Sequence, residues 1–148
     1  MHAWLCENPI GVDALSWTEL PTPQPAKGQV LIRIQAASLN FPDLLIVQNK
    51  YQFKPELPFV PGSEYAGVVE AVGSAASTIR PGDEVFGTTF MAGFGALAER
   101  VAVAERHVAV RPGNTTFEES AAVPLATSTA LQALRDHGGV RPGQRVLI

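Results

Sequence analysis

Proline and glycine divide the first 113 residues into short segments, and this spacing limits that part of the chain to short strands and brief helices. The 148 residues include 13 glycines and 12 prolines, and both types favour turns because proline fixes φ whereas glycine tolerates positive φ. Between the turns apolar side chains alternate with others, as at Val30, Ile32 and Ile34, which is typical of strands. We expect strands at residues 1–6, 14–20, 29–38, 64–72 and 84–86. Such a series predicts a mainly β (α+β) fold arranged as a barrel or sandwich.

Beyond residue 113 the pattern indicates helices. Thr116 and Glu119 have the spacing of a capping box, which predicts the start of a helix. Pro124 should interrupt that helix, because proline lacks the amide hydrogen and clashes with the preceding turn, and we expect a second helix over residues 125–136. Residues 145–148 are predicted to begin a buried parallel strand. Since no strand partner follows in the sequence, we expect the chain to be a piece of a longer protein.

Composition excludes several classes of protein. The chain has 11 Lys and Arg against 14 Asp and Glu, a formal net charge of −3, and no basic run, which argues against a nucleic-acid partner. Its apolar runs are far shorter than the roughly 18 residues that cross a bilayer, and the N-terminus lacks the pattern of a secretion signal. One cysteine excludes an internal disulfide framework. We therefore expect a cytoplasmic globular protein that does not bind a membrane.

Neither a metal site nor a covalent nucleophile is indicated by the sequence. The three histidines are far apart in the chain and Cys6 is isolated, whereas a zinc site needs three or four clustered ligands. We therefore expect no metal. Ser63 lies one residue too early for the G-x-S-x-G motif of a nucleophile elbow, so an ordinary turn or cap role is favoured for it.

One glycine motif and one polar motif could contact a ligand. Gly93, Gly95 and Ala98 match the dinucleotide pattern G-x-G-x-x-[GA], but an alternating segment follows where the motif requires a helix. We interpret it as a loop that enters a strand. Asn40 and Asp43 have the spacing of a helix N-cap and its third residue. They can also face a cleft, and the two interpretations are compatible.

Several further runs, taken together with the Asn40 segment, have the residues and spacing of one known family. They are Asn40-Phe41-Pro42-Asp43-Leu44-Leu45, Tyr51, Leu57-Pro58-Phe59-Val60-Pro61-Gly62-Ser63-Glu64, Ala66-Gly67-Val68-Val69, Val72-Gly73 and Gly82-Asp83-Glu84-Val85. Over essentially its whole length the chain resembles the N-terminal catalytic domain of the medium-chain dehydrogenase/reductase superfamily. Within that superfamily it is similar to the zinc-free quinone oxidoreductase (zeta-crystallin-like) branch.

The resemblance implies both a fold and a domain division. Residues 1–120 would form a GroES-like catalytic domain, a partly open barrel that binds the acceptor. Residues 121–148 would form the crossover helix and the first strand of a nucleotide-binding Rossmann domain, the remainder of which is absent from this chain. A missing partner domain would leave an apolar patch on the helix of residues 121–134, from which we expect a homo-oligomer.

The same resemblance bears on the metal and the cofactor. Zinc alcohol dehydrogenases carry Cys where this chain has Asn40, and Gly-His-Glu where it has Gly62-Ser63-Glu64, so the resemblance also implies zinc independence. It implies NADPH or NADH as the hydride donor of the full-length parent, and a small-molecule acceptor, either a quinone or an activated alkene. The chain alone would be inactive without the rest of the cofactor site.

The resemblance finally suggests site residues. Asn40, Asp43 and Tyr51 would be catalytic residues on the acceptor side, Thr129 and Asn40 would contact the nicotinamide, and Phe41 with Tyr51 would bind the acceptor. Two other functions remain open at this stage. One is an enoyl-thioester reductase of the same superfamily, and the other is a non-catalytic GroES-like module that binds a ligand or partner.

Overall fold

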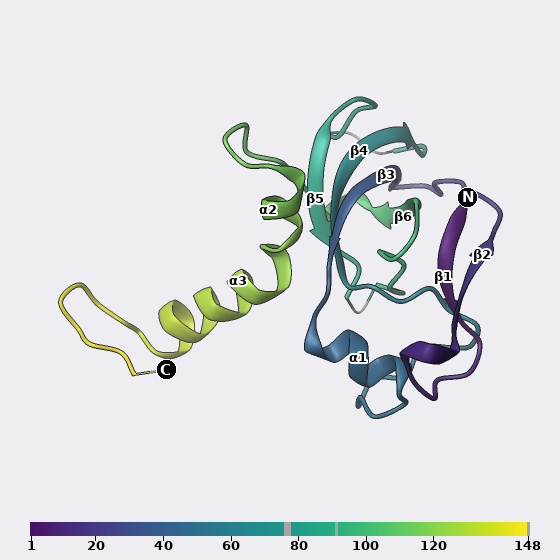
Figure 1. Cartoon of the computed structure of the whole chain (residues 1–148). Coiled ribbons are helices and arrows are strands. Elements are labelled where there is room, and N and C mark those ends of the chain that lie inside the picture. The colour runs from purple at the N-terminus through teal and green to yellow at the C-terminus, as the bar shows by residue number, and fades with distance from the viewer. Residues whose placement is uncertain (76–77, 91, 148) are drawn as a thin grey trace.

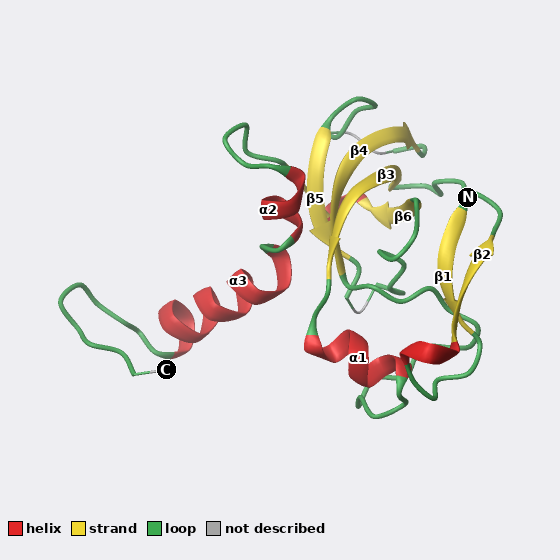
Figure 2. Cartoon of the chain, in the orientation of Figure 1, coloured by secondary structure: helices red, strands yellow, loops and turns green. Residues whose placement is uncertain are grey.

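The protein is mainly β, with short helices at one end of its main sheet and at its C-terminal end (Figures 1 and 2). The computed structural model describes residues 1–75, 78–90 and 92–147. The strands within these ranges are β1 (His2–Cys6), β2 (Leu15–Glu19), β3 (Gln29–Ser38), β4 (Glu64–Val72), β5 (Glu84–Thr88), β6 (Arg100–Ala104) and β7 (Val108–Val110). The helices are η1 (Val12–Ala14), α1 (Phe41–Val47), η2 (Glu105–His107), α2 (Phe117–Ala121), α3 (Pro124–Leu131) and η3 (Gln132–His137).

The main sheet is antiparallel and open. Its strand order is β6-β3-β4-β5-β7, and β1 pairs with β2 in a separate two-stranded sheet. Two isolated bridges, Ala3 to Ala98 and Cys6 to Phe59, connect β1 with the main body. The expected mainly β architecture is therefore confirmed, with a sheet that does not close into a barrel among the described strands.

Alternating apolar side chains hold the centre of this sheet. Val30 and Ile32 on β3 are fully buried, and they pack with Val69, Val101 and Val103 from the two neighbouring strands. Burying such side chains stabilises the fold by about 1.5–3 kcal/mol each. The long β3 is the common neighbour of β4 and β6, so the chain leaves β3 from the middle of the sheet and enters α1.

A second apolar cluster fixes α1 against the rest of the molecule. It contains Cys6, Ile46, Val47, Phe59 and Phe94, all nearly inaccessible to solvent. Because Ile46 and Val47 lie in the last turn of α1, this packing anchors the C-terminal end of the helix. The first turn of α1 then lies at the end of the main sheet (Figure 1).

The C-terminal helices follow the predicted capping pattern at their start. Thr116 Oγ1 accepts a hydrogen bond of 3.1 Å from the Glu119 amide, and Glu119 Oε2 accepts one of 2.8 Å from the Thr116 amide. This confirms the capping box, and α2 packs against β3 and β4. The chain then breaks at Pro124 as expected, and α3 extends away from the sheets (Figure 2).

Two expectations for the C-terminal segment were wrong in detail. The helix expected over residues 125–136 changes at Gln132 into a π-helical turn that ends at His137. Residues 145–147 form no strand, and Ile148 lies outside the described residues. The physical reason is the lack of a neighbour within the described residues, because a strand needs a partner for its backbone groups and Leu147 is 98% exposed.

Candidate functional site

The site begins where β3 ends and α1 starts. Asn40 is the N-cap residue of α1, with extended φ and ψ of −119° and 155°. The Asp43 carboxylate accepts a hydrogen bond of 2.9 Å from the Asn40 amide, and the Asp43 amide donates one of 3.0 Å to the Asn40 carbonyl. Pro42 fits this first turn, where an amide hydrogen has no intrahelical acceptor. The sequence-based expectation of a cap at Asn40 is thus confirmed.

The start of β4 brings two more polar side chains to the same place. Ser38, the last residue of β3, pairs with Glu64, the first residue of β4. Glu64 Oε1 accepts a hydrogen bond of 2.7 Å from Asn40 Nδ2, and the Ser63 hydroxyl donates to Asp43 Oδ1. Ser63 and Glu64 are fully buried and Asp43 is 6% exposed. Four polar residues therefore form one connected network at the end of the sheet.

The charge state of Asp43 reflects this burial. Removal from water raises the pKa of the Asp43 carboxyl above its usual range, since burial penalises the charged form. The hydrogen bonds from the Ser63 hydroxyl and the Asn40 backbone amide lower that pKa, and the nearby Glu64 carboxylate raises it. Burial is the largest of these effects, so the pKa of Asp43 lies above that of an exposed aspartate.

Glu64 also contacts α3, the helix that follows α2. Its second oxygen, Oε2, accepts a hydrogen bond of 2.7 Å from the backbone amide of Leu125. That amide lies in the first turn of α3, whose N-cap residue, Val123, has no side-chain hydrogen bond to offer. One buried carboxylate thus joins the start of α1 to the start of α3.

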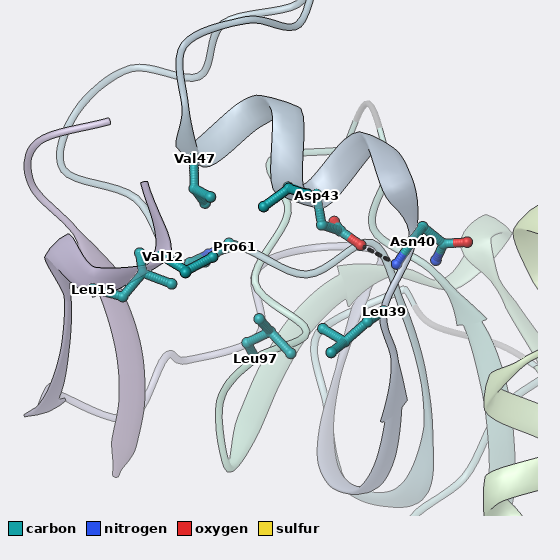
Figure 3. A pocket seen from close by; sticks show the side chains of 9 residues that line it. Val12, Leu15, Leu39, Asn40, Asp43, Val47, Pro61 and Leu97 are labelled. Carbon is teal, nitrogen blue, oxygen red and sulfur yellow. Dashed lines mark hydrogen bonds between the residues drawn. The ribbon is translucent and has the colours of Figure 1, made fainter. Parts of the chain in front are cut away.

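An apolar pocket of about 160 Å³ lies beside this network (Figure 3). Asn40 and Asp43 line one side of it, and the remaining lining comes from η1, α1, β2 and three connecting loops. Those residues are Val12, Leu15, Leu39, Leu44, Val47, Pro61 and Leu97. The Asn40 amide oxygen points away from Asp43 and from these apolar side chains (Figure 3). The pocket can enclose an apolar group, with the amide at its edge.

The expected site residues lie in different places. Asn40 and Asp43 lie together, but Tyr51 lines a second pocket with Phe53 and Phe59, and its ring is 6.1 Å from that of Phe90. Phe41 is 71% exposed. The structure does not bring Tyr51 into the pocket of Asn40 and Asp43, and the roles expected for Tyr51 and Phe41 stay predictions.

Thr129 lies on the exposed part of α3. Its hydroxyl donates a hydrogen bond of 2.7 Å to the Leu125 carbonyl one turn earlier. Since Leu125 is also the residue whose amide contacts Glu64, Thr129 and Asn40 are connected through a single carboxylate and one helical turn. The nicotinamide contact expected for Thr129 stays a prediction.

Sequence reasoning did not select Glu64 or Ser63 as site residues. The sequence indicates Ser63 as a turn or cap residue at the place of a zinc ligand, and Glu64 as the residue after it and the start of a strand. One signal was available, because two polar residues directly precede the apolar strand of residues 65–69. Polar residues that are buried need partners, and here those partners are Asp43, Asn40 and Leu125.

Other kinds of site find no support within the described residues. No three His, Cys, Asp or Glu side chains in residues 1–75, 78–90 and 92–147 are grouped closely enough to hold a metal ion. The glycine motif at residues 93–98 is a loop that leads into β6, as the sequence indicated. Across the same ranges no helix is long and apolar enough to cross a membrane.

Comparison with known sequences places this fold in one family. The sequence pattern of the alcohol dehydrogenase GroES-like domain matches residues 26–113, and the chain belongs to that family. Its relatives include 2-methylene-furan-3-one reductase of Solanum lycopersicum, 38% identical over 100% of this chain and 40% of the relative. Quinone oxidoreductase of Lama guanicoe is 36% identical over 88% of this chain and 39% of the relative. The resemblance to quinone oxidoreductases of the medium-chain superfamily is thereby confirmed.

A third relative and two solved structures extend the comparison. NADPH-dependent alkenal/one oxidoreductase of Arabidopsis thaliana is 39% identical over 90% of this chain and 37% of its own. The quinone oxidoreductase structure from Coxiella burnetii has a TM-score of 0.90 at 30% identity, covering 97% of this chain and 46% of that one. A mycobacterial protein complexed with NADPH has a TM-score of 0.86 at 35% identity over 97% and 43%. The chain thus spans less than half the length of these proteins.

Proposed function

We propose that the chain is the acceptor-binding part of a zinc-independent, NAD(P)H-dependent reductase of quinones or enones. In this proposal residues 1–120 shape the acceptor site, and residues 121–148 begin the nucleotide-binding part. The relatives that are named as quinone or alkenal/one oxidoreductases support the class of reaction. The function of the whole protein is part of the proposal.

The proposal rests mainly on the position of the Asn40 side-chain amide, which lies at the edge of an apolar pocket. Its Nδ2 is committed to Glu64, so the oxygen lies on the opposite side of the amide. A planar electron-poor acceptor needs an apolar wall and a few fixed polar contacts, and the pocket provides the wall in Leu39, Leu97 and their neighbours.

The residues present also fit the carboxamide of a nicotinamide. The Asn40 oxygen is a hydrogen-bond acceptor that suits an amide NH2, and the Thr129 side chain lies on the helix that the same carboxylate anchors. A bound reduced nicotinamide supplies the hydride, which is the difficult part of the chemistry. This chain's residues then bind and orient the reactants and exclude water.

Zinc independence is supported by the contacts of Asn40 and Ser63. The Asn40 amide donates to Glu64 and the Ser63 hydroxyl donates to Asp43. Neither side chain carries an imidazole or thiolate, which are the usual zinc ligands together with carboxylates. A quinone also accepts hydride without a Lewis acid, and solvent can protonate the product.

The test is a steady-state assay of the full-length gene product with NADPH or NADH and three acceptors: a quinone, an enone and an enoyl-thioester. We expect turnover of the quinone or the enone, and elemental analysis without stoichiometric zinc. Asn40→Leu should lower kcat/KM about tenfold or more, since a positioned hydrogen bond is lost, whereas the exposed Asn114→Leu should not. Turnover of the enoyl-thioester alone, or one zinc per chain, would overturn the proposal.

A further inference from the structure

Glu64 differs from the other carboxylates of the sheet in being fully buried and in contacting two separate helices. Its side chain is 0% exposed. Oε1 accepts from Asn40 Nδ2 and Oε2 accepts from the Leu125 amide, both at 2.7 Å. By contrast Glu70, on the same strand, pairs with Arg100 and Arg33 at the surface.

A buried carboxylate is a costly way to fill a core position. An apolar side chain of similar volume is often as stable or more stable than a buried charge, so packing alone does not explain a glutamate here. The two hydrogen bonds explain the glutamate, because Oε1 accepts from Asn40 Nδ2 and Oε2 accepts from the Leu125 backbone amide. The Leu125 amide lies in the first turn of α3, where amides have no intrahelical acceptor.

We propose that Glu64 is a positioning residue that fixes the orientation of the Asn40 amide and the start of α3 at the same time. Glu64 Oε1 accepts from Asn40 Nδ2, so the NH2 end of the Asn40 side-chain amide faces the Glu64 carboxyl group. The opposite end, Oδ1, is thereby presented away from Glu64. The same carboxylate holds α3, which carries Thr129, in a set position relative to Asn40.

The substitution Glu64→Gln separates these two tasks. Glutamine has one acceptor oxygen and one NH2 group, so it cannot accept from both donors. If its oxygen stays on the Leu125 amide, its NH2 faces Asn40, and the Asn40 amide must turn over to present Oδ1 to it. If its oxygen stays on Asn40, the Leu125 amide loses its acceptor.

The test uses heteronuclear NMR and amide hydrogen exchange on the 148-residue chain. In Glu64→Gln we expect either a large change in the Asn40 side-chain NH2 signals, or exchange of the Leu125 amide that is about tenfold faster, as expected for the loss of one hydrogen bond. Glu70→Gln, which removes a carboxylate from the same strand, is the matched control and should change neither. If both signals stay unchanged in Glu64→Gln, the inference is wrong.

If Glu64→Gln does not fold, amide hydrogen exchange of the unsubstituted chain still tests the inference. Ala126 follows Leu125 in the same turn, and its amide makes no hydrogen bond within the described residues. The Leu125 amide should therefore exchange about tenfold more slowly than the Ala126 amide. Equal exchange of the two amides would show that Glu64 does not hold α3.

The effect of Glu64→Gln on turnover rests on the proposed function. The positioning role of Glu64 and the proposed reaction can be rejected separately. In the full-length protein Glu64→Gln should lower kcat more than it raises KM for the quinone, because the Asn40 amide is misoriented rather than lost. NMR changes in a protein without quinone or enone turnover would leave the positioning role intact and reject the proposed reaction. Unchanged kcat in an active enzyme would reject the positioning role.

Discussion

Asp43 lies in an environment unlike that of an ordinary exposed acid. Its carboxyl is buried between Ser63 and the Asn40 amide, close to Glu64. Burial raises its pKa, so the folded protein holds the carboxyl proton more tightly than the unfolded chain does. Its contribution to stability is therefore fully present below the unfolded pKa of about 3.9, and it is lost as pH rises through the folded pKa.

This sign predicts the outcome of a substitution. Asp43→Asn resembles the protonated acid in shape but does not titrate. The free energy of unfolding of the natural chain minus that of Asp43→Asn should decrease as the pH rises above about 3.9. Urea denaturation at several pH values measures that difference.

The exposed Asp13→Asn is the control for loss of one negative charge. A difference that instead increased with pH would mean that the hydrogen bonds from Ser63 and the Asn40 amide outweigh burial. That result would assign to Asp43 an ionised structural role in the cap of α1.

Among the site residues, the sequence predicted contacts between near neighbours in the chain but not contacts between residues far apart in it. Asn40 and Asp43 are three residues apart, so their mutual capping follows from helix geometry alone. Glu64 contacts Asn40 across 24 residues and Leu125 across 61, and no local pattern encodes such separations.

Among the elements, β4 is limited by a close approach of two backbones. Gly67 pairs with Ile34 near a register shift in β3, and a Cβ at Gly67 would lie 2.2 Å from the Arg33 carbonyl oxygen. That distance is well inside van der Waals contact, and a backbone atom in a central strand cannot move aside easily. Glycine is therefore required in a segment that otherwise favours β-branched residues.

Gly67→Ala should lower the free energy of unfolding by about 1–3 kcal/mol, the usual cost of overpacking a core. Gly113→Ala is the matched control, because a Cβ there meets nothing within 4 Å and its φ is not left-handed. It should change stability by no more than about 0.5 kcal/mol. Chemical denaturation of the two variants in parallel measures the contrast, and equal losses would contradict the close approach.

Element boundaries could be predicted where alternation or a cap defines them. The strands at Gln29–Ser38 and Glu64–Val72 have the bounds that alternation indicated, and Thr116 caps α2 as its spacing required. The end of α3 could not be predicted, because the change to a π turn at Gln132 involves exposed residues that no neighbour constrains.

At the scale of the whole molecule, the start of each α-helix already holds a carboxylate of the chain itself. Asp43 accepts at the first turn of α1, Glu119 at that of α2, and Glu64 at that of α3. A helix N-terminus attracts anions through its free amides and its dipole. Where a carboxyl group of the chain already accepts from an amide at that position, a pyrophosphate would meet a competing acceptor there.

This arrangement predicts weak binding of NADPH by the 148-residue chain. The glycine loop of residues 93–98 leads into a strand, so it does not direct its amides to a phosphate at a helix start. We expect a Kd of about 1 mM or weaker by titration calorimetry. The full-length protein, titrated in the same buffer, is the control, and its affinity should be far higher if the proposed function is right. Micromolar binding to the 148-residue chain would mean that these capped helix starts do not exclude the pyrophosphate.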